Sequence, residues 1–207
     1  MQSYGPAYRV ITPRLVVRCW KPDDAPKLQK AIDASLKELR EFMPWAMAEP
    51  EPVEAKTIRL RQFRGAFDLG QDFIYGIFDG EEREVLGGTG LHTRQGPFVR
   101  EIGYWIATAH TKKGYATEAA SAMMQVAFRV DGVPRVEVRC EPDNVASVAV
   151  AKKLGMKLEG TLRANTVRPD GSVRDTLLFS ALKAELDDLP ARNLSVQAFG
   201  SVGERLI

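Results

Sequence analysis

The sequence predicts an α/β protein with a mixed, mostly antiparallel sheet, and three observations support this fold class. Residues 101–106 alternate and carry aromatic side chains, as a half-buried strand does, and residues 116–128 place apolar side chains at helical spacing. Residues 136–140 alternate again, and a strand-helix-strand crossover would place this second strand parallel to the first. Apolar runs on either side of Asp79 and Gly80 predict an antiparallel hairpin.

Length and composition predict one domain. The chain has 207 residues, and we expect the domain to cover residues 1–186. Residues 187–207 show no clear periodicity and are interpreted as a C-terminal tail, either a mobile end or an arm on a partner. The net charge of +2 is nearly balanced, which argues against direct binding of nucleic acid.

The cysteines and the hydropathy pattern predict a cytoplasmic location. Cys19 and Cys140 each lie in an apolar, strand-like run, which suits packed, reduced thiols better than a disulfide framework. We find no signal peptide and no apolar run of about 18 residues, so we expect no membrane partner.

The first half of the chain is expected to supply a strand and two helices. Residues 12–20 predict the strand, and Pro22 with its two following aspartates predicts a helix entrance. A helical stripe then comprises Leu28, Ala31, Ile32, Leu36 and Leu39. A second helix is predicted from about 53 to 68, with Gly70 as its stop.

The remaining strands follow from turns. Residues 73–78 and 85–91 form the predicted hairpin, and the Gly96-Pro97 turn leads into the strand at 101–106. These three consecutive strands should be antiparallel. Residues 161–168 and 174–182 predict a closing hairpin across a turn at 169–172.

A basic turn joins the central strand to the central helix. Lys112, Lys113 and Gly114 stand directly before the helix, so free backbone N–H groups at a helix N-terminus lie beside two ammonium charges. This pattern favours a phosphate group, although basic residues before a helix are usually a solvated surface. The nucleotide loop G-x-x-x-x-G-K-[ST] is absent, and the glycines at 87, 88 and 90 lack the third glycine of a dinucleotide fingerprint.

Two motifs resemble those of the GNAT acyltransferases. The turn Thr111-Lys-Lys-Gly-Tyr-Ala116, followed by Thr-Glu-Ala, is similar to their acetyl-coenzyme A turn, with Thr111 where Gln or Arg is usual. Asn144-x-x-Ser147, followed by Lys-Leu-Gly and then by Glu-Gly at 159–160, resembles the RimJ/RimL-type branch, the ribosomal-protein N-terminal acetyltransferases. The resemblance spans residues 12 to 185.

This resemblance implies a GNAT fold with a six- to seven-stranded sheet, a central splay and about four helices. It also implies acetyl-CoA as co-substrate, no metal, and direct transfer in a ternary complex. The pantetheine arm would lie in the splay near Trp105 and Ile106, opposite the strand that ends at Cys140. The other residues implied in cofactor binding are Thr111, Lys112, Lys113, Gly114, Tyr115, Ala116, Thr117 and Asn144.

The chemistry requires a neutral amine, donors for the developing oxyanion and a partner for the departing thiolate. The tyrosine that many GNAT proteins use for the thiolate is replaced by Ala151, which leaves Ser147 as the candidate, unless Ser147 only supports the first helical turn. Glu101 is the leading general base. His92, His110 and water are alternatives, because an α-amino group with a pKa of about 8 is partly neutral at pH 7.

Two aromatic residues bear on the acceptor. Trp45 lies in an apolar stretch that could plug the core, but in a transferase it could line the acceptor pocket, to which we also assign Tyr104. The α-amino group of a protein or peptide is the expected acceptor. A small amine such as an amino acid, polyamine or antibiotic is the alternative, as is a non-catalytic acetyl-CoA-binding module, and a homodimer is possible.

Overall fold

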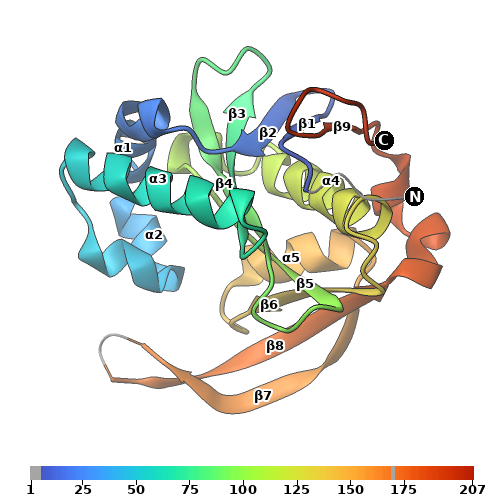
Figure 1. The fold of residues 1–207 in the computed structure, drawn as a ribbon. Helices are drawn as coiled ribbons and strands as arrows, with labels where there is room; N and C mark the ends of the chain where they lie inside the picture. The colour runs from blue at the N-terminus through green and yellow to red at the C-terminus, as the bar shows by residue number, and fades with distance from the viewer. Residues whose placement is uncertain (1–5, 169–170) are drawn as a thin grey trace.

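One sheet organises the part of the chain described by the computed structural model, residues 6–168 and 171–207 (Figure 1). Within these residues it has nine strands in the order β7-β8-β6-β5-β4-β3-β2-β1-β9. The strands are β1 Arg9–Ile11, β2 Leu15–Cys19, β3 Phe73–Asp79, β4 Val85–His92, β5 Val99–Ile106, β6 Arg135–Cys140, β7 Lys157–Val167, β8 Val173–Leu182 and β9 Gln197–Phe199. The pair β5–β6 is parallel and the other described pairs are antiparallel, which confirms the predicted fold class.

Helices cover both faces of the sheet (Figure 1). The α-helices are α1 Ala25–Asp33, α2 Leu36–Phe42, α3 Val53–Asp68, α4 Tyr115–Arg129 and α5 Val145–Lys153, and the short 3-10 helices are η1 Pro22–Asp24, η2 Pro44–Ala48, η3 Thr108–His110, η4 Lys183–Asp188 and η5 Pro190–Asn193. One apolar cluster holds the buried faces of α4 and α5, and the other holds those of α1 and α2 with Leu60 of α3. None of the described helices is long and apolar enough to span a membrane.

The predicted stripe at 28–39 forms two helices instead of one. Ser35 separates α1 from α2 because its hydroxyl donates to the Ala31 carbonyl (2.8 Å) and accepts the Thr108 N–H (3.0 Å). A serine that bonds the carbonyl four residues back competes with the regular helical pattern. The break also attaches the two helices to the segment that follows β5.

Two turns differ in detail from the prediction. The hairpin β3–β4 begins at Asp79 as expected, but its loop runs to Glu84, whose N–H donates to the Asp79 carboxylate (2.8 Å). The closing hairpin is β7–β8, where the Arg168 N–H donates to the Ser172 carbonyl (2.8 Å). Pro169 and Asp170 of the predicted turn lie outside the described residues.

The segment predicted as a tail is part of the sheet. Its strand β9 pairs with β1, with Ala198 opposite Val10, and both side chains are fully buried. Gln125 of α4 also donates to the carbonyls of Ala191 (2.7 Å) and Leu194 (2.9 Å). The expectation of a mobile end or a partner arm is therefore wrong. β1 and β9 are too short to show alternation, which is also why the predicted strand count of six to seven is too low.

Candidate functional site

The central strands β5 and β6 part from each other. They pair at only three positions, and the last of these joins Glu101 to Glu137. Beyond it, β5 stays paired with β4 as far as Ile106, while β6 stays paired with β8 as far as Cys140. The backbone groups of residues 102–106 that face β6 consequently lack a ladder partner and are available to a ligand. This is the predicted splay, with Trp105, Ile106 and Cys140 at its open end.

The turn before α4 presents free backbone amides. Lys112 (φ 62°) and Gly114 (φ 83°) adopt left-handed conformations, which turn the chain sharply into the helix. The first backbone hydrogen bond of the helical type runs from the Glu118 N–H to the Gly114 carbonyl (3.0 Å). The N–H groups of residues 115–117 precede that bond and have no partner within the helix. They add to the positive end of the helix dipole, so the turn suits an anion.

The other predicted residues of the turn divide into two groups. Lys112 and Lys113 are exposed, with their ammonium groups free to approach an anion. The Thr111 hydroxyl and N–H instead both donate to the Thr108 carbonyl, at 2.9 and 3.3 Å. Thr111 therefore stabilises the entry to the turn, and the two lysines provide its charge.

Ser147 lies in the first turn of α5, on the same side of the sheet as α4. The Asn144 side chain caps α5 by accepting the Ser147 N–H (3.0 Å), which leaves the Ser147 hydroxyl for other contacts. That hydroxyl lies 2.9 Å from the hydroxyl of Tyr104 on β5. The structure thus brings Tyr104, assigned to the acceptor pocket by sequence, to Ser147 across the splay. The two residues are 43 positions apart, so no local pattern could signal this contact.

Burial sets the protonation state of this cluster. It raises the pKa of the Tyr104 hydroxyl, against the opposing effect of the hydrogen bond with Ser147. Burial likewise raises the pKa of the Cys140 thiol, and a hydrogen bond with Ser147 again opposes the shift. Tyr104, Ser147 and Cys140 therefore form a cluster of neutral groups with protons to donate near pH 7.

Glu101 lies at the closed end of the splay. Its carboxylate receives two hydrogen bonds from Arg94 (2.5 and 3.0 Å) and one from the Gln95 amide (3.0 Å), and Arg139 lies 3.9 Å away. Burial disfavours ionisation of this carboxylate, but the hydrogen bonds and charge of Arg94 outweigh burial and lower the pKa of Glu101. Glu101 is therefore ionised at neutral pH.

Both histidines hold acidic partners. His92 Nδ1 lies 3.0 Å from an Asp72 oxygen, and His110 Nε2 lies 3.2 Å from a Glu84 oxygen. Burial opposes ionisation of Asp72, but the bond with His92 outweighs it and lowers the pKa of Asp72. Each histidine thus bridges two segments of the chain through an ion pair or hydrogen bond.

Two tryptophans meet on the sheet face opposite α4. The rings of Trp45, in η2, and Trp105 have centroids 5.8 Å apart and an interplanar angle of 60°. The Trp105 ring needs Gly88, because a Cβ there would lie 2.6 Å from its indole nitrogen. The Trp105 backbone needs Gly87, because a Cβ there would lie 2.1 Å from its carbonyl oxygen. The glycine run of β4 therefore serves close packing.

A groove lies beside Trp45, between the α2–η2 segment and the β7–β8 hairpin. Its volume is about 290 Å³, and it is lined by Arg40, Glu41, Phe42, Met43, Pro44, Met47, Arg168 and Arg174. Arg168 and Arg174 both pair with Glu141, which directly follows Cys140 at the open end of the splay. The groove is therefore lined by both apolar side chains and arginines, and two of its arginines connect it to the end of β6 through Glu141.

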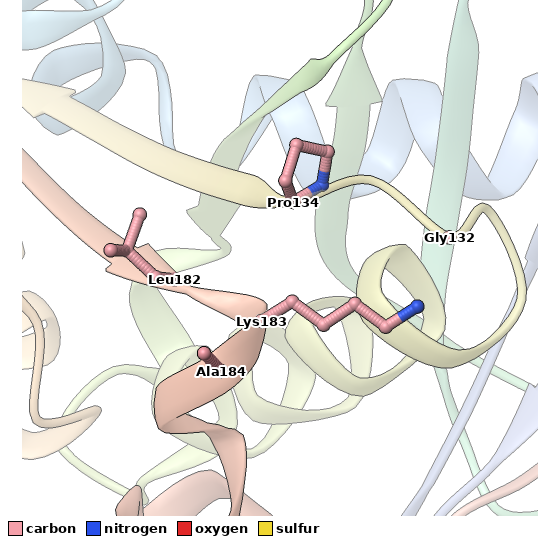
Figure 2. Close-up of a pocket in the computed structure, with 5 residues that line it drawn as sticks. All are labelled: Gly132, Pro134, Leu182, Lys183 and Ala184. Carbon is pink, nitrogen blue, oxygen red and sulfur yellow. The ribbon is translucent and has the colours of Figure 1, made fainter.

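A second, shallow pocket lies away from the splay. Gly132, Pro134, Leu182, Lys183 and Ala184 line it at the beginning of β6, the end opposite Cys140 (Figure 2). Its one ionisable lining residue is Lys183, so this pocket lacks the donors found at the splay. Among residues 6–168 and 171–207, no group of three or more His, Cys, Asp or Glu side chains is arranged to hold a metal ion.

Comparisons with known proteins agree with this geometry. Residues 14–157 match the model of the acetyltransferase (GNAT) domain. The [ribosomal protein uS5]-alanine N-acetyltransferase of Escherichia coli is 29% identical over 188 residues, which cover 86% of this chain and 92% of that protein. Two solved structures share the fold. The Microcin C7 self immunity acetyltransferase MccE, in complex with acetyl-CoA and AMP, has a TM-score of 0.76 at 19% identity and covers 82% of this chain and 93% of its own. The ribosomal L7/L12 alpha-N-protein acetyltransferase RimL, in complex with coenzyme A, has a TM-score of 0.74 at 20% identity. The match covers 83% of this chain and 96% of the RimL chain.

Proposed function

The chain belongs to the GNAT acetyltransferase family, and from this premise we propose that it transfers an acetyl group from acetyl-CoA to the α-amino group of a protein or peptide. The observation that carries the choice of acceptor is the groove beside Trp45, which apolar side chains and arginines line together. The similarity to an enzyme named for acetylating an alanine of ribosomal protein uS5 supports the same class of acceptor.

The turn and the splay fit acetyl-CoA. The turn offers the N–H groups of residues 115–117, with Lys112 and Lys113 beside them, to the diphosphate. Asn144 caps α5 on the same side, and the unpaired backbone of residues 102–106 offers hydrogen bonds to the pantetheine arm. When bound, acetyl-CoA supplies an acyl group on a good leaving thiolate. The Ala107 N–H donates to the Leu86 carbonyl, so the Ile106 N–H faces away from β4 into the splay. It is the donor for charge that develops on the acyl oxygen.

Ser147 is assigned to the departing thiolate. Its hydroxyl is free of the helix cap and is aligned by Tyr104, so it can donate a proton or a hydrogen bond into the splay. The Tyr104 hydroxyl also contacts the Ser147 carbonyl (3.3 Å), which fixes the orientation of the pair.

Ser147→Ala is expected to lower kcat about 100-fold with little change in KM for acetyl-CoA, since proton donation in the transition state contributes roughly that factor. The cap survives because it uses the Ser147 N–H, so steady-state kinetics isolate the hydroxyl. Ser180→Ala is the matched control, because that hydroxyl donates to Glu159 on the β7–β8 hairpin and should leave kcat unchanged. An unaltered kcat in Ser147→Ala would exclude this role.

Glu101 is assigned to collect the proton of the amine, directly or through water. The hydrogen bonds and charge of Arg94 lower its pKa despite burial, so Glu101 is already ionised between pH 6 and 9 and adds no rising limb to the profile there. The rise of kcat/KM in that range should follow the acceptor amine, with a pKa of about 8.

Glu101→Gln is expected to lower kcat/KM about 100-fold between pH 6 and 9, because the amide cannot accept the proton. The measurement is a pH–rate profile of the variant. Glu159→Gln is the control, because Glu159, on β7, is also paired with an arginine, and its profile should match that of the wild type. If the profile of Glu101→Gln coincides with that of the wild type, water or another group is the base.

The groove favours a peptide over a polycationic small acceptor. Its charged lining residues are Arg40, Arg168, Arg174 and Glu41. Glu141 neutralises Arg168 and Arg174, so the lining offers no cluster of free carboxylates to a polyamine or an aminoglycoside. An extended peptide can lay apolar side chains against the apolar residues of the groove while its amine reaches the splay. A deep acidic pocket, which a polycation would need, is not found among the residues that line this groove.

An acceptor panel tests the proposal. Peptides with free N-termini, the same peptides with blocked N-termini, amino acids, spermidine and an aminoglycoside would each be incubated with acetyl-CoA. Release of coenzyme A thiol and the mass of the product would be measured. We expect free peptides to exceed every small amine in kcat/KM by at least about tenfold, with the acetyl group on the α-amino nitrogen. A preferred small amine, or acetylation of blocked peptides, would refute the proposed acceptor.

A further inference from the structure

Arg14, directly before β2, joins the beginning of the chain to the turn before α4. Its Nη1 donates to the Lys113 carbonyl (2.9 Å), and its Nε and Nη2 both lie 2.6 Å from Glu118 Oε2. The same guanidinium lies over the Tyr115 ring, 4.7 Å from its centroid. The Arg14 side chain thus contacts three residues, Lys113, Tyr115 and Glu118, within residues 113–118.

The Glu118 carboxylate accepts its hydrogen bonds from residues 12–14. Its side chain is only 7% exposed, and besides the Arg14 guanidinium it accepts the Thr12 hydroxyl (2.6 Å) and the Arg14 backbone N–H (3.1 Å). A buried carboxylate persists when it is paired and hydrogen-bonded, and here both conditions are met by residues 12–14. The first turn of α4 is therefore attached to the segment between β1 and β2.

The bond to Lys113 orients the next amide. A trans peptide is planar, so the Lys113 carbonyl and the Gly114 N–H point in opposite directions. Because Arg14 holds the carbonyl, the Gly114 N–H must point away from Arg14. Gly114 adopts a φ of 83°, which only glycine tolerates at low cost. The Cβ of a larger residue at position 114 would also lie 3.4 Å from Arg14 Nη2.

We propose that Arg14 is a positioning residue for the cofactor turn. Together with Glu118, it fixes the peptide between residues 113 and 114 and the first turn of α4. In that conformation the backbone N–H groups of both segments point to the diphosphate of acetyl-CoA. This inference rests on the proposed binding of acetyl-CoA at the turn. Prior ordering of a loop lowers the entropic cost of binding. Since Arg14 does not contact Ser147, Tyr104 or Glu101, it acts on affinity and not on the chemical step.

The test compares affinity with turnover. Arg14→Gln and Arg14→Lys are expected to raise the Kd for acetyl-CoA, measured by calorimetry, and its KM about tenfold or more, with kcat at saturation within about twofold of wild type. Lysine keeps the charge but cannot contact Lys113 and Glu118 with a planar fork, so it should not restore affinity. Arg64→Gln is the matched control, because Arg64 also pairs with a carboxylate, that of Asp68, and lies over a tyrosine ring, that of Tyr8.

The outcomes separate this inference from the function on which it rests. Failure of the wild-type protein to bind acetyl-CoA would refute the proposed function itself. Wild-type binding with an unchanged Kd in both Arg14 variants would refute only the positioning role. Full affinity in Arg14→Lys would show that charge alone matters and would also refute that role. Glu118→Gln, which leaves Arg14 in place, should weaken binding in the same way, and circular dichroism would verify that each variant is folded.

Discussion

Gly114→Val is expected to raise the Kd for acetyl-CoA at least about 100-fold, which corresponds to about 2.8 kcal/mol of binding free energy. Gly114 has a φ of 83°, a conformation that costs an ordinary residue about 1–2 kcal/mol and a β-branched residue more. The variant can relieve this strain only by rotating the peptides on either side. Those peptides carry the Gly114 and Tyr115 N–H groups, so the anion site is lost together with the turn.

Gly70→Val separates loss of the site from backbone strain alone. Gly70 ends α3 with a φ of 67°, and nothing lies within 4 Å of a Cβ built there. It therefore shares the strain of Gly114 but lies outside the cofactor turn. We expect Gly70→Val to lower the melting temperature while it retains the affinity for acetyl-CoA. Near-normal binding by Gly114→Val, measured by calorimetry, would exclude the turn as the diphosphate site.

Lys56→Met is expected to have the largest effect on stability, a loss of about 3 kcal/mol or more in the free energy of unfolding. The side chains of Lys56, in α3, and Glu49, after η2, are both fully buried and form an ion pair. Without Lys56, the Glu49 carboxylate stays buried with only Arg59, 3.4 Å away, as a cationic partner. An unpaired buried charge costs far more than a surface ion pair contributes. Urea unfolding at pH 7 measures the loss.

Two further variants test this interpretation. Lys37→Met alters an exposed lysine of α2 and should change the free energy of unfolding by less than about 0.5 kcal/mol. The double variant Lys56→Met with Glu49→Leu removes both charges and should recover part of the lost stability, because an apolar pair of similar size can replace a buried ion pair. If the double variant is less stable than Lys56→Met, the Glu49 carboxylate left without Lys56 is not the cause.

Much of the central architecture is predictable because its signals are local. The alternation of β5, the helical spacing of α4 and the glycine at 114 lie next to one another in the sequence, and each reflects the geometry of a single element. The same holds for Asn144 as the cap of α5. The Ser35 break and β9 escaped prediction because the spacing of apolar residues reports neither the bonds of Ser35 to Ala31 and Thr108 nor the pairing of a three-residue strand with β1.

The sequence by itself therefore determined the family, the fold class, the order of the central elements and the position of the basic turn before α4. Only the tertiary structure decided which side chains meet. It brings Tyr104 to Ser147 and Arg14 to Glu118, pairs separated by 43 and 104 residues. The physical reason is that backbone conformation depends mainly on neighbouring residues, whereas these contacts form only once the packing of strands and helices has placed distant segments side by side.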